Sequence, residues 1–262
     1  MAVSHAERLL QELGITEPDE IDLEAIAYHV NARVRFRPLD GCEARIIGHG
    51  DEAIITVNAN SAYRRKRFSI AHELGHWHHH RGKCLACRLE EYRPRDALSP
   101  ERAADGYAAD LLMPHYLFKP LARQQGKLTF KAVNALADMF KTSRPATAIR
   151  LVESDHSPAL LVCHGPKGRK WFTRAPSVPQ KWFPQDFLHA ESFAFGVQFG
   201  ENQDDSIPRK IGADAWFDRR DADRFEVQEQ TMRSGPDETL TLILINDSTM
   251  LEEQDKRRSW MR

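Results

Sequence analysis

The chain has 262 residues, a formal net charge of −1, 41% hydrophobic residues and 29% charged residues. This balance is typical of an ordinary globular protein and excludes a generally basic polyanion binder, so any basic surface must be local. No run approaches the roughly 18 apolar residues of a membrane span, and the N-terminus lacks the apolar core of a signal peptide. Four cysteines are too few for a disulfide scaffold of this size. We therefore expect a cytoplasmic protein without a membrane partner.

The first part of the chain predicts two helices followed by short strands. Apolar residues recur at helical spacing in 4–13 and 22–30. Runs typical of strands follow at 34–37, 44–47 and 53–58. The turn-like GHGDE between the last two runs predicts a hairpin, and we expect the last strand to be an edge strand of a small antiparallel sheet.

Two longer helices are predicted next. The first is rich in histidine, spans about 64–80 and is closed by Gly82. The second begins at Ser99 and Pro100, a good N-cap and first residue, and ends at Pro114. Small residues in this second helix would let it approach a neighbouring helix closely: Ala103, Ala104, Gly106 and Ala108.

The rest of the chain changes character twice. In 127–154, the segments LTFKAVNALADMF and PATAIRLVE predict two helices joined by the turn KTSR, an arrangement that resembles a helix-turn-helix. The part 155–262 is predicted to be a β-rich domain, with strand-like runs ALLVCH, KWFTR, SFAFGVQF, DAWFD and TLTLILIN. With a mostly helical first part over 1–126, the predicted fold class is α+β in three parts.

The motif His72-Glu73-Leu74-Gly75-His76 lies on the predicted histidine-rich helix. Residues four apart share one helix face, so the two imidazoles can bind one metal ion. Glu73 lies about 100° round the helix, where it can act as a general base without being a ligand. A catalytic zinc ion also needs a third protein ligand and one open position.

Glu101 is the best candidate for the third ligand. A metzincin would need glycine at 79 and histidine at 82, whereas the chain has His79 and Gly82. Glu101 instead opens a second helix, and Asp105 follows on the same face, where it can hydrogen-bond a ligand histidine as in gluzincins. Weaker candidates lie in the connecting segment: Glu90, Glu91 and Asp96.

These motifs together resemble the ImmA/IrrE family of cytoplasmic metallopeptidases. The sequence AHELGH is followed by ERAADGYAADLLMP, which is similar to the family helix E-x-x-A-N-x-F-A-x-x-L-L-M-P, with Asp105 in place of asparagine and Tyr107 in place of phenylalanine. The resemblance covers about 20–153. The three-part order also resembles IrrE-type members, whose last part is a GAF-like sensor domain.

The resemblance implies a zincin-like endopeptidase that cleaves a helix-turn-helix, XRE-type transcriptional repressor and so derepresses stress or DNA-damage response genes. We expect Zn²⁺ as the cofactor, with Mn²⁺ or Fe²⁺ as alternatives in the cell. In the expected mechanism, Glu73 accepts a proton from the attacking water. The alternative function is a DNA-binding transcriptional regulator whose metal site is structural or vestigial.

Several weaker signals leave alternatives open. Tyr63 and Tyr107 are candidates for stabilising the oxyanion, although Tyr107 also suits the core. Cys84 and Cys87 form one CxxC pair, which suits an incidental role, half of a second metal site or a redox switch. The basic run 63–67 is either a solvated face or a docking surface.

The segment 127–154 is only mildly basic, so it predicts weak DNA contact at most. In 168–183, aromatic and cationic residues alternate, which suits either a nucleic-acid stacking surface or a β-domain core with cations at its margin.

Overall fold

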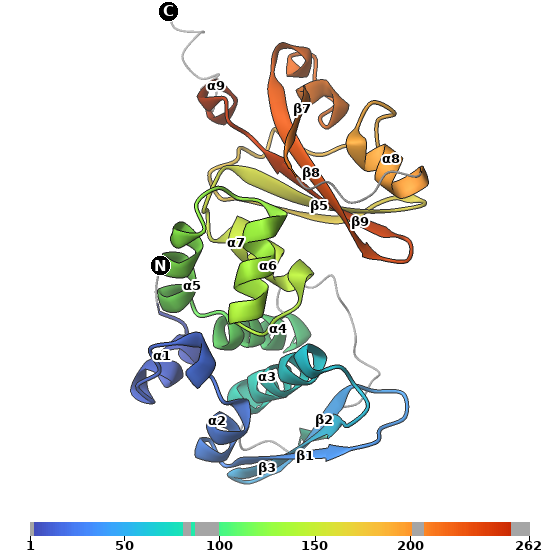
Figure 1. Ribbon diagram of the computed structural model, residues 1–262. Coiled ribbons are helices and arrows are strands. Elements are labelled where there is room, and N and C mark those ends of the chain that lie inside the picture. The colour runs from blue at the N-terminus through green and yellow to red at the C-terminus, as the bar shows by residue number, and fades with distance from the viewer. Residues whose placement is uncertain (1–2, 81–84, 87–99, 201–206, 253–262) are drawn as a thin grey trace, which may run out of the picture. The chain divides into compact units, whose positions relative to one another are not determined.

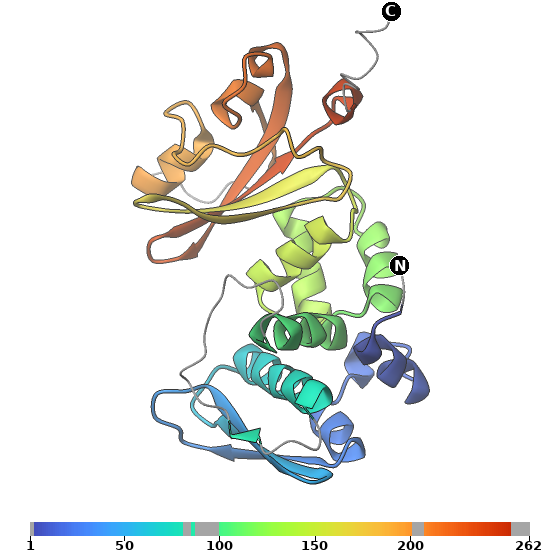
Figure 2. The same cartoon turned by 180° about the vertical axis from the view of Figure 1, so that it is seen from behind.

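The computed structural model describes residues 3–80, 85–86, 100–200 and 207–252 (Figures 1 and 2). Helices and two sheets occur together, which confirms the α+β class. The chain forms two compact units, Met1–Leu121 with Leu136–Ala146 and Ala122–Ala135 with Thr147–Arg262. The domain boundaries expected at 126 and 154 stay predictions. None of the described helices is both long and apolar enough to span a membrane.

The first unit opens with two short capped helices, α1 (His5–Glu12) and α2 (Leu23–His29), as predicted. Ser4 Oγ accepts a hydrogen bond from the Glu7 amide, and the Glu7 carboxylate accepts one from the Ser4 amide. The Asp22 carboxylate caps α2 by accepting hydrogen bonds from the Glu24 and Ala25 amides. Such caps satisfy backbone donors that a short helix leaves unpaired at its start.

The sheet of the first unit is mixed, not antiparallel as predicted. It consists of β1 (Ala32–Arg37), β2 (Ala44–His49), β3 (Glu52–Asn58) and β4 (Leu85–Ala86), in the order β1-β3-β2-β4. The predicted hairpin of β2 and β3 is confirmed, but β3 also pairs in parallel with β1.

The expectation that 53–58 is an edge strand was therefore wrong. Strand β3 is hydrogen-bonded on both sides, to β1 and to β2, and its buried side chains are Ala53, Ile55 and Val57. The segment between β1 and β2 carries the chain past β3, so β1 takes the edge.

Two helices of the first unit carry the conspicuous motifs. Helix α3 (Tyr63–His80) buries Ile70, Leu74 and Trp77, and the Trp77 ring nitrogen donates to the Val30 carbonyl at 2.8 Å. Helix α4 (Pro100–Leu112) buries an apolar stripe that includes Ala104, Ala108 and Leu111. Ala103 and Gly106, which were expected to help helix packing, are exposed.

Three further helices follow α4. Helix α5 (His115–Gln124) was not predicted. Helices α6 (Phe130–Met139) and α7 (Arg144–Glu153) lie where two helices were predicted. Their assignment to a DNA-binding helix-turn-helix stays a prediction.

The second unit contains a five-stranded sheet in which every neighbouring pair is antiparallel. The strand order is β6-β5-β9-β8-β7. Its strands are β5 (Ala159–Gly165), β6 (Gly168–Arg174), β7 (Arg209–Gly212), β8 (Glu226–Gly235) and β9 (Glu238–Leu244). The β-rich character is as expected, while the GAF-like assignment stays a prediction.

Two of the predicted strands in this unit were wrong. SFAFGVQF forms helix α8 (Phe193–Phe199), because Ser192 caps it and the buried Glu229 carboxylate accepts hydrogen bonds from Ser192 Oγ and the Phe193 amide. DAWFD overlaps the 3₁₀ turn Ala213–Ala215 and contributes only an isolated bridge from Phe217 to Pro184.

His164 makes the stability of the second unit depend on pH. It is buried in β5, and neither ring nitrogen makes a hydrogen bond of normal geometry to a described residue. Burial lowers the pKa of His164 to about 4, although the Gln185 backbone opposes this decrease. Between pH 6.5 and 4 the unfolded chain therefore binds more protons than the folded chain, so stability falls as the pH falls.

We expect the wild type to lose about 2 kcal/mol of stability between pH 7.5 and 5 through this group, a loss that His164→Leu removes. Urea unfolding at both pH values measures the difference between the two proteins. The exposed His189→Gln serves as the control. Equal pH dependence in wild type and His164→Leu would contradict the assignment.

Candidate metal centre

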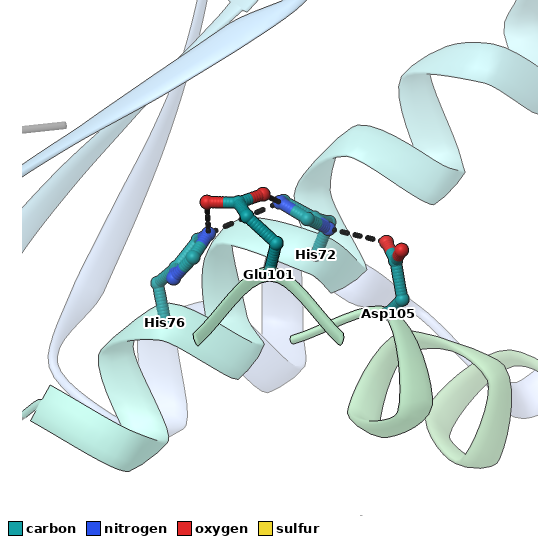
Figure 3. A network of polar contacts seen from close by, with 4 residues as sticks. All are labelled: His72, His76, Glu101 and Asp105. Atoms are coloured by element: carbon teal, nitrogen blue, oxygen red, sulfur yellow. Dashed lines mark hydrogen bonds and ion pairs between the residues drawn. The ribbon is translucent and has the colours of Figure 1, made fainter. Parts of the chain in front are cut away.

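Three side chains from α3 and α4 converge in the first unit (Figure 3). His72 and His76, one turn apart on α3, point their Nε2 atoms toward each other at 3.1 Å. Glu101, near the start of α4, places Oε2 3.2 Å from His72 Nε2 and Oε1 3.3 Å from His76 Nε2. The structure thus brings together the three residues that were predicted as ligands.

The two helices reach this geometry through a close approach at Gly75. A β-carbon at Gly75 would lie 2.8 Å from Ala104 Cα and 2.9 Å from the Ala104 carbonyl oxygen. Real β-carbons do not come that close to backbone atoms, so the crossing requires glycine at 75 and a small residue at 104. Gly75 was not among the predicted packing residues, although it lies within the motif.

Asp105 orients one of the candidate ligands. Its Oδ1 lies 2.9 Å from His72 Nδ1, and a carboxylate only accepts, so His72 donates the Nδ1 proton (Figure 3). The opposite nitrogen, Nε2, is then unprotonated, and its lone pair points toward the space between Glu101 and His76. Burial lowers the pKa of His72, but Asp105, Glu73 and Glu101 outweigh burial and raise this pKa above its ordinary value.

The donor set fits a divalent metal ion. Ligands placed tetrahedrally around zinc at about 2.0–2.1 Å lie about 3.3 Å from one another. The three separations here are 3.1, 3.2 and 3.3 Å. Two imidazoles and a carboxylate also suit several first-row metals, so this chemistry indicates a cation without fixing which one.

Glu73 lies beside this group with the character of a general base. Its side chain is buried, with 4% of the residue exposed, and Oε2 accepts no hydrogen bond from a described residue. Burial raises the pKa of the Glu73 carboxyl to about 7, His72 lowers it and the charge of Glu101 raises it further. A carboxyl group with a pKa near neutrality can both accept and release a proton during turnover.

The two tyrosines considered as oxyanion stabilisers are not part of the group formed by His72, His76 and Glu101. Tyr107 stacks on His78 with ring centroids 5.1 Å apart, and it follows Glu101 by six positions, on a different face of α4. Tyr63 is exposed at the start of α3, nine positions or about 13 Å along the helix from His72. A role for either residue in catalysis stays untested.

The remaining candidates lie outside the described residues. They are the CxxC pair, Cys84 and Cys87, and the weaker ligand candidates Glu90, Glu91 and Asp96. Among the described residues, the group of His72, His76 and Glu101 is the one set of three that could hold a metal ion.

Asp105 provides a test of how the ligand geometry is maintained. We expect Asp105→Ala to weaken metal affinity by about 10- to 100-fold, because His72 loses its orienting acceptor. Asp105→Asn keeps an oxygen acceptor and should retain most of the affinity. Competition with a chromophoric chelator measures both values, and equal affinity of all three proteins would show that Asp105 does not orient His72.

Comparison with known proteins agrees with this geometry. Residues 28–152 match the peptidase M78 family model, described as the IrrE N-terminal-like domain. This segment contains all four residues of Figure 3. A search of curated proteins found no match to the chain.

A solved structure also shares the fold. This structure, a "Mycobacterium tuberculosis transcriptional regulator", is similar with a TM-score of 0.57 and 15% sequence identity, covering 91% of this chain and 85% of the other. The low identity limits this likeness to the fold, whereas the family match comes from the sequence itself. Residues 28–152 therefore form an IrrE N-terminal-like domain, which supports membership in the ImmA/IrrE family and indicates a metallopeptidase domain.

Proposed function

We propose that the protein is a zinc-dependent endopeptidase that cleaves a helix-turn-helix, XRE-type transcriptional repressor at a specific site and so derepresses stress or DNA-damage response genes. The observation that carries the proposal is the convergence of His72, His76 and Glu101 with a buried carboxylate, Glu73, beside them. A purely structural zinc site would have a fourth protein ligand. It would not need a general base beside the ion.

In the proposed mechanism, His72, His76 and Glu101 would hold the ion, and Asp105 keeps His72 in the tautomer that leaves Nε2 free for it. The bound ion would supply Lewis-acid activation of the water and of the peptide carbonyl. Glu73 takes a proton from the attacking water as the new C–O bond forms. It then gives this proton to the amine nitrogen as the C–N bond breaks.

Strand β1 is the better candidate for aligning the substrate. It lies at the end of the strand order and pairs with β3 on one side. An extended peptide can add to such an edge through main-chain hydrogen bonds, with its side chains alternating between the two faces. This assignment replaces β3, whose two sides are both occupied by described strands.

The substrate class rests on family membership and is a proposal for this chain. An extended segment of such a repressor could pair with an edge strand through main-chain hydrogen bonds. The similar solved structure is that of a transcriptional regulator, which is consistent with a regulatory setting.

The test is co-expression with helix-turn-helix repressors encoded nearby, followed by intact-mass measurement of each repressor. We expect one repressor to be converted into two fragments whose masses add up to the intact mass plus one water. If purified protein that holds one ion per chain cleaves none of them, the result favours the alternative, a DNA-binding regulator with a structural metal site.

A further inference from the structure

One face of the first unit's sheet carries four arginines. Arg33, Arg35 and Arg37 alternate along β1, and Arg45 lies on β2. Successive side chains of a strand point to opposite faces, so the three residues of β1 share a face at a spacing of about 7 Å. All four side chains are exposed, and we call this set the arginine face.

The strand register places Arg45 on the same face. Arg35 and Arg45 both lie opposite Thr56 of the central strand, from its two sides. Strand spacing of about 4.8 Å then puts their α-carbons about 10 Å apart. The other face of the sheet buries Ile46, Ile55 and Val57, and Figures 1 and 2 show α3 on one side of the strands.

The charge of the arginine face is not neutralised by the described residues. None of the four guanidinium groups forms a described ion pair or hydrogen bond. Glu52 is the one acidic residue at the paired positions of this face in β1, β2 and β3. Within the three strands, four positive charges and one negative charge give this face a net charge of +3, in a chain whose total is −1. Glu43, directly before β2, is paired with Arg65.

The basic run 63–67, which was considered for docking, differs in this respect. Arg64 pairs with Asp138, and Arg65 pairs with Glu43. Lys66 donates to the Ala59 carbonyl, and the buried Arg67 donates to the Ile21 carbonyl. These cations therefore serve internal contacts, whereas the arginine face offers its donors to solvent.

The arginine face borders a groove with exposed apolar side chains. The groove has a volume of about 870 Å³, and its lining includes Arg33, Arg35, Tyr28, Ile47 and His49. Tyr28 is 73% exposed and Ile47 is 58% exposed, which is unusual for side chains of this size. The groove thus combines a row of cations with an open aromatic ring.

This combination favours single-stranded nucleic acid over an acidic peptide. A positive groove can follow the phosphate backbone while an aromatic ring stacks on a base, and every base has a π-face. Arginine also binds phosphate oxygens with two donors at once. An acidic peptide would use the charges but would leave the exposed ring of Tyr28 without a role.

We propose that the arginine face and the adjoining groove bind single-stranded nucleic acid, with the arginines on phosphates and Tyr28 stacked on a base. This site is separate from the metal centre, and its occupation requires no metal ion. It would hold the protein on nucleic acid independently of proteolysis.

The test is fluorescence anisotropy with a labelled 12-nucleotide oligothymidine, using the full-length protein. We expect Arg33→Glu with Arg35→Glu to weaken binding at least about tenfold, and Tyr28→Ala to weaken it about fivefold or more. Arg123→Glu with Arg220→Glu changes the net charge equally at exposed residues elsewhere and should have little effect. If the first pair fails to fold, Arg35→Gln with Arg45→Gln replaces it.

Three outcomes would overturn the proposal. Equal losses in both double variants would show that only total charge matters. Unchanged binding after Tyr28→Ala, combined with equal competition by polyglutamate, would assign the face to an acidic protein. Absence of binding at about 50 mM salt, where phosphate contacts are strongest, would show that the face binds no nucleic acid.

Discussion

Replacing Glu73 with glutamine should abolish cleavage of the repressor while the metal ion stays bound. Glutamine has nearly the same shape but cannot accept the proton from water, and loss of a general base lowers the rate by about 10²- to 10⁴-fold. Glu73 is the buried carboxylate beside the proposed ligands, so its replacement removes the proposed general base. Intact-mass measurement of the repressor after incubation gives the rate, and native mass spectrometry gives the metal content.

His76→Gln is the matched comparison for this experiment. It removes a ligand donor within 3.3 Å of the Glu101 carboxylate, so both metal content and cleavage should fall. Glu73→Gln should separate the two readouts, because its metal content stays at the wild-type level. Full proteolysis by Glu73→Gln would refute the proposed role, whereas loss of metal in this variant would show that Glu73 helps to hold the ion.

Much of the metal centre could be predicted from the sequence because helical spacing determines which side chains share a face. His72 and His76 needed only the period of α3, and Glu101 with Asp105 needed only the period of α4. The closeness of the two helices was harder to predict. It depends on Gly75 and Ala104 meeting at the crossing, whereas Ala103 and Gly106, which were also predicted to allow it, are exposed.

The second unit shows why strand prediction failed where polar residues are buried. Strand β8 contains Glu229, Gln230 and Thr231, which are buried and hydrogen-bonded, so its sequence lacks the apolar pattern of a core strand. Conversely, the apolar run of α8 was predicted to be a strand. Its helical form depends on Ser192 and on the distant Glu229, a contact that no local pattern contains.

The pair Gly75→Ala and Gly106→Ala tests whether the helix crossing maintains the metal centre. At Gly75, an added methyl group meets the Ala104 backbone at 2.8 Å, so α3 and α4 must move apart. We expect a stability loss of about 1–3 kcal/mol, as for other insertions into a packed core. Metal affinity should fall as well, because His72 and His76 lie on one helix and Glu101 on the other.

Gly106→Ala is the matched control, since nothing lies within 4 Å of the added methyl group and the residue is exposed in the same helix pair. Alanine is the better helix former, so this variant should gain about 0.5–1 kcal/mol and keep its metal affinity. Thermal unfolding with and without zinc, combined with chelator competition, measures both quantities. If Gly75→Ala were as stable and bound metal as tightly as Gly106→Ala, the close crossing would not be needed to bring the three ligands together.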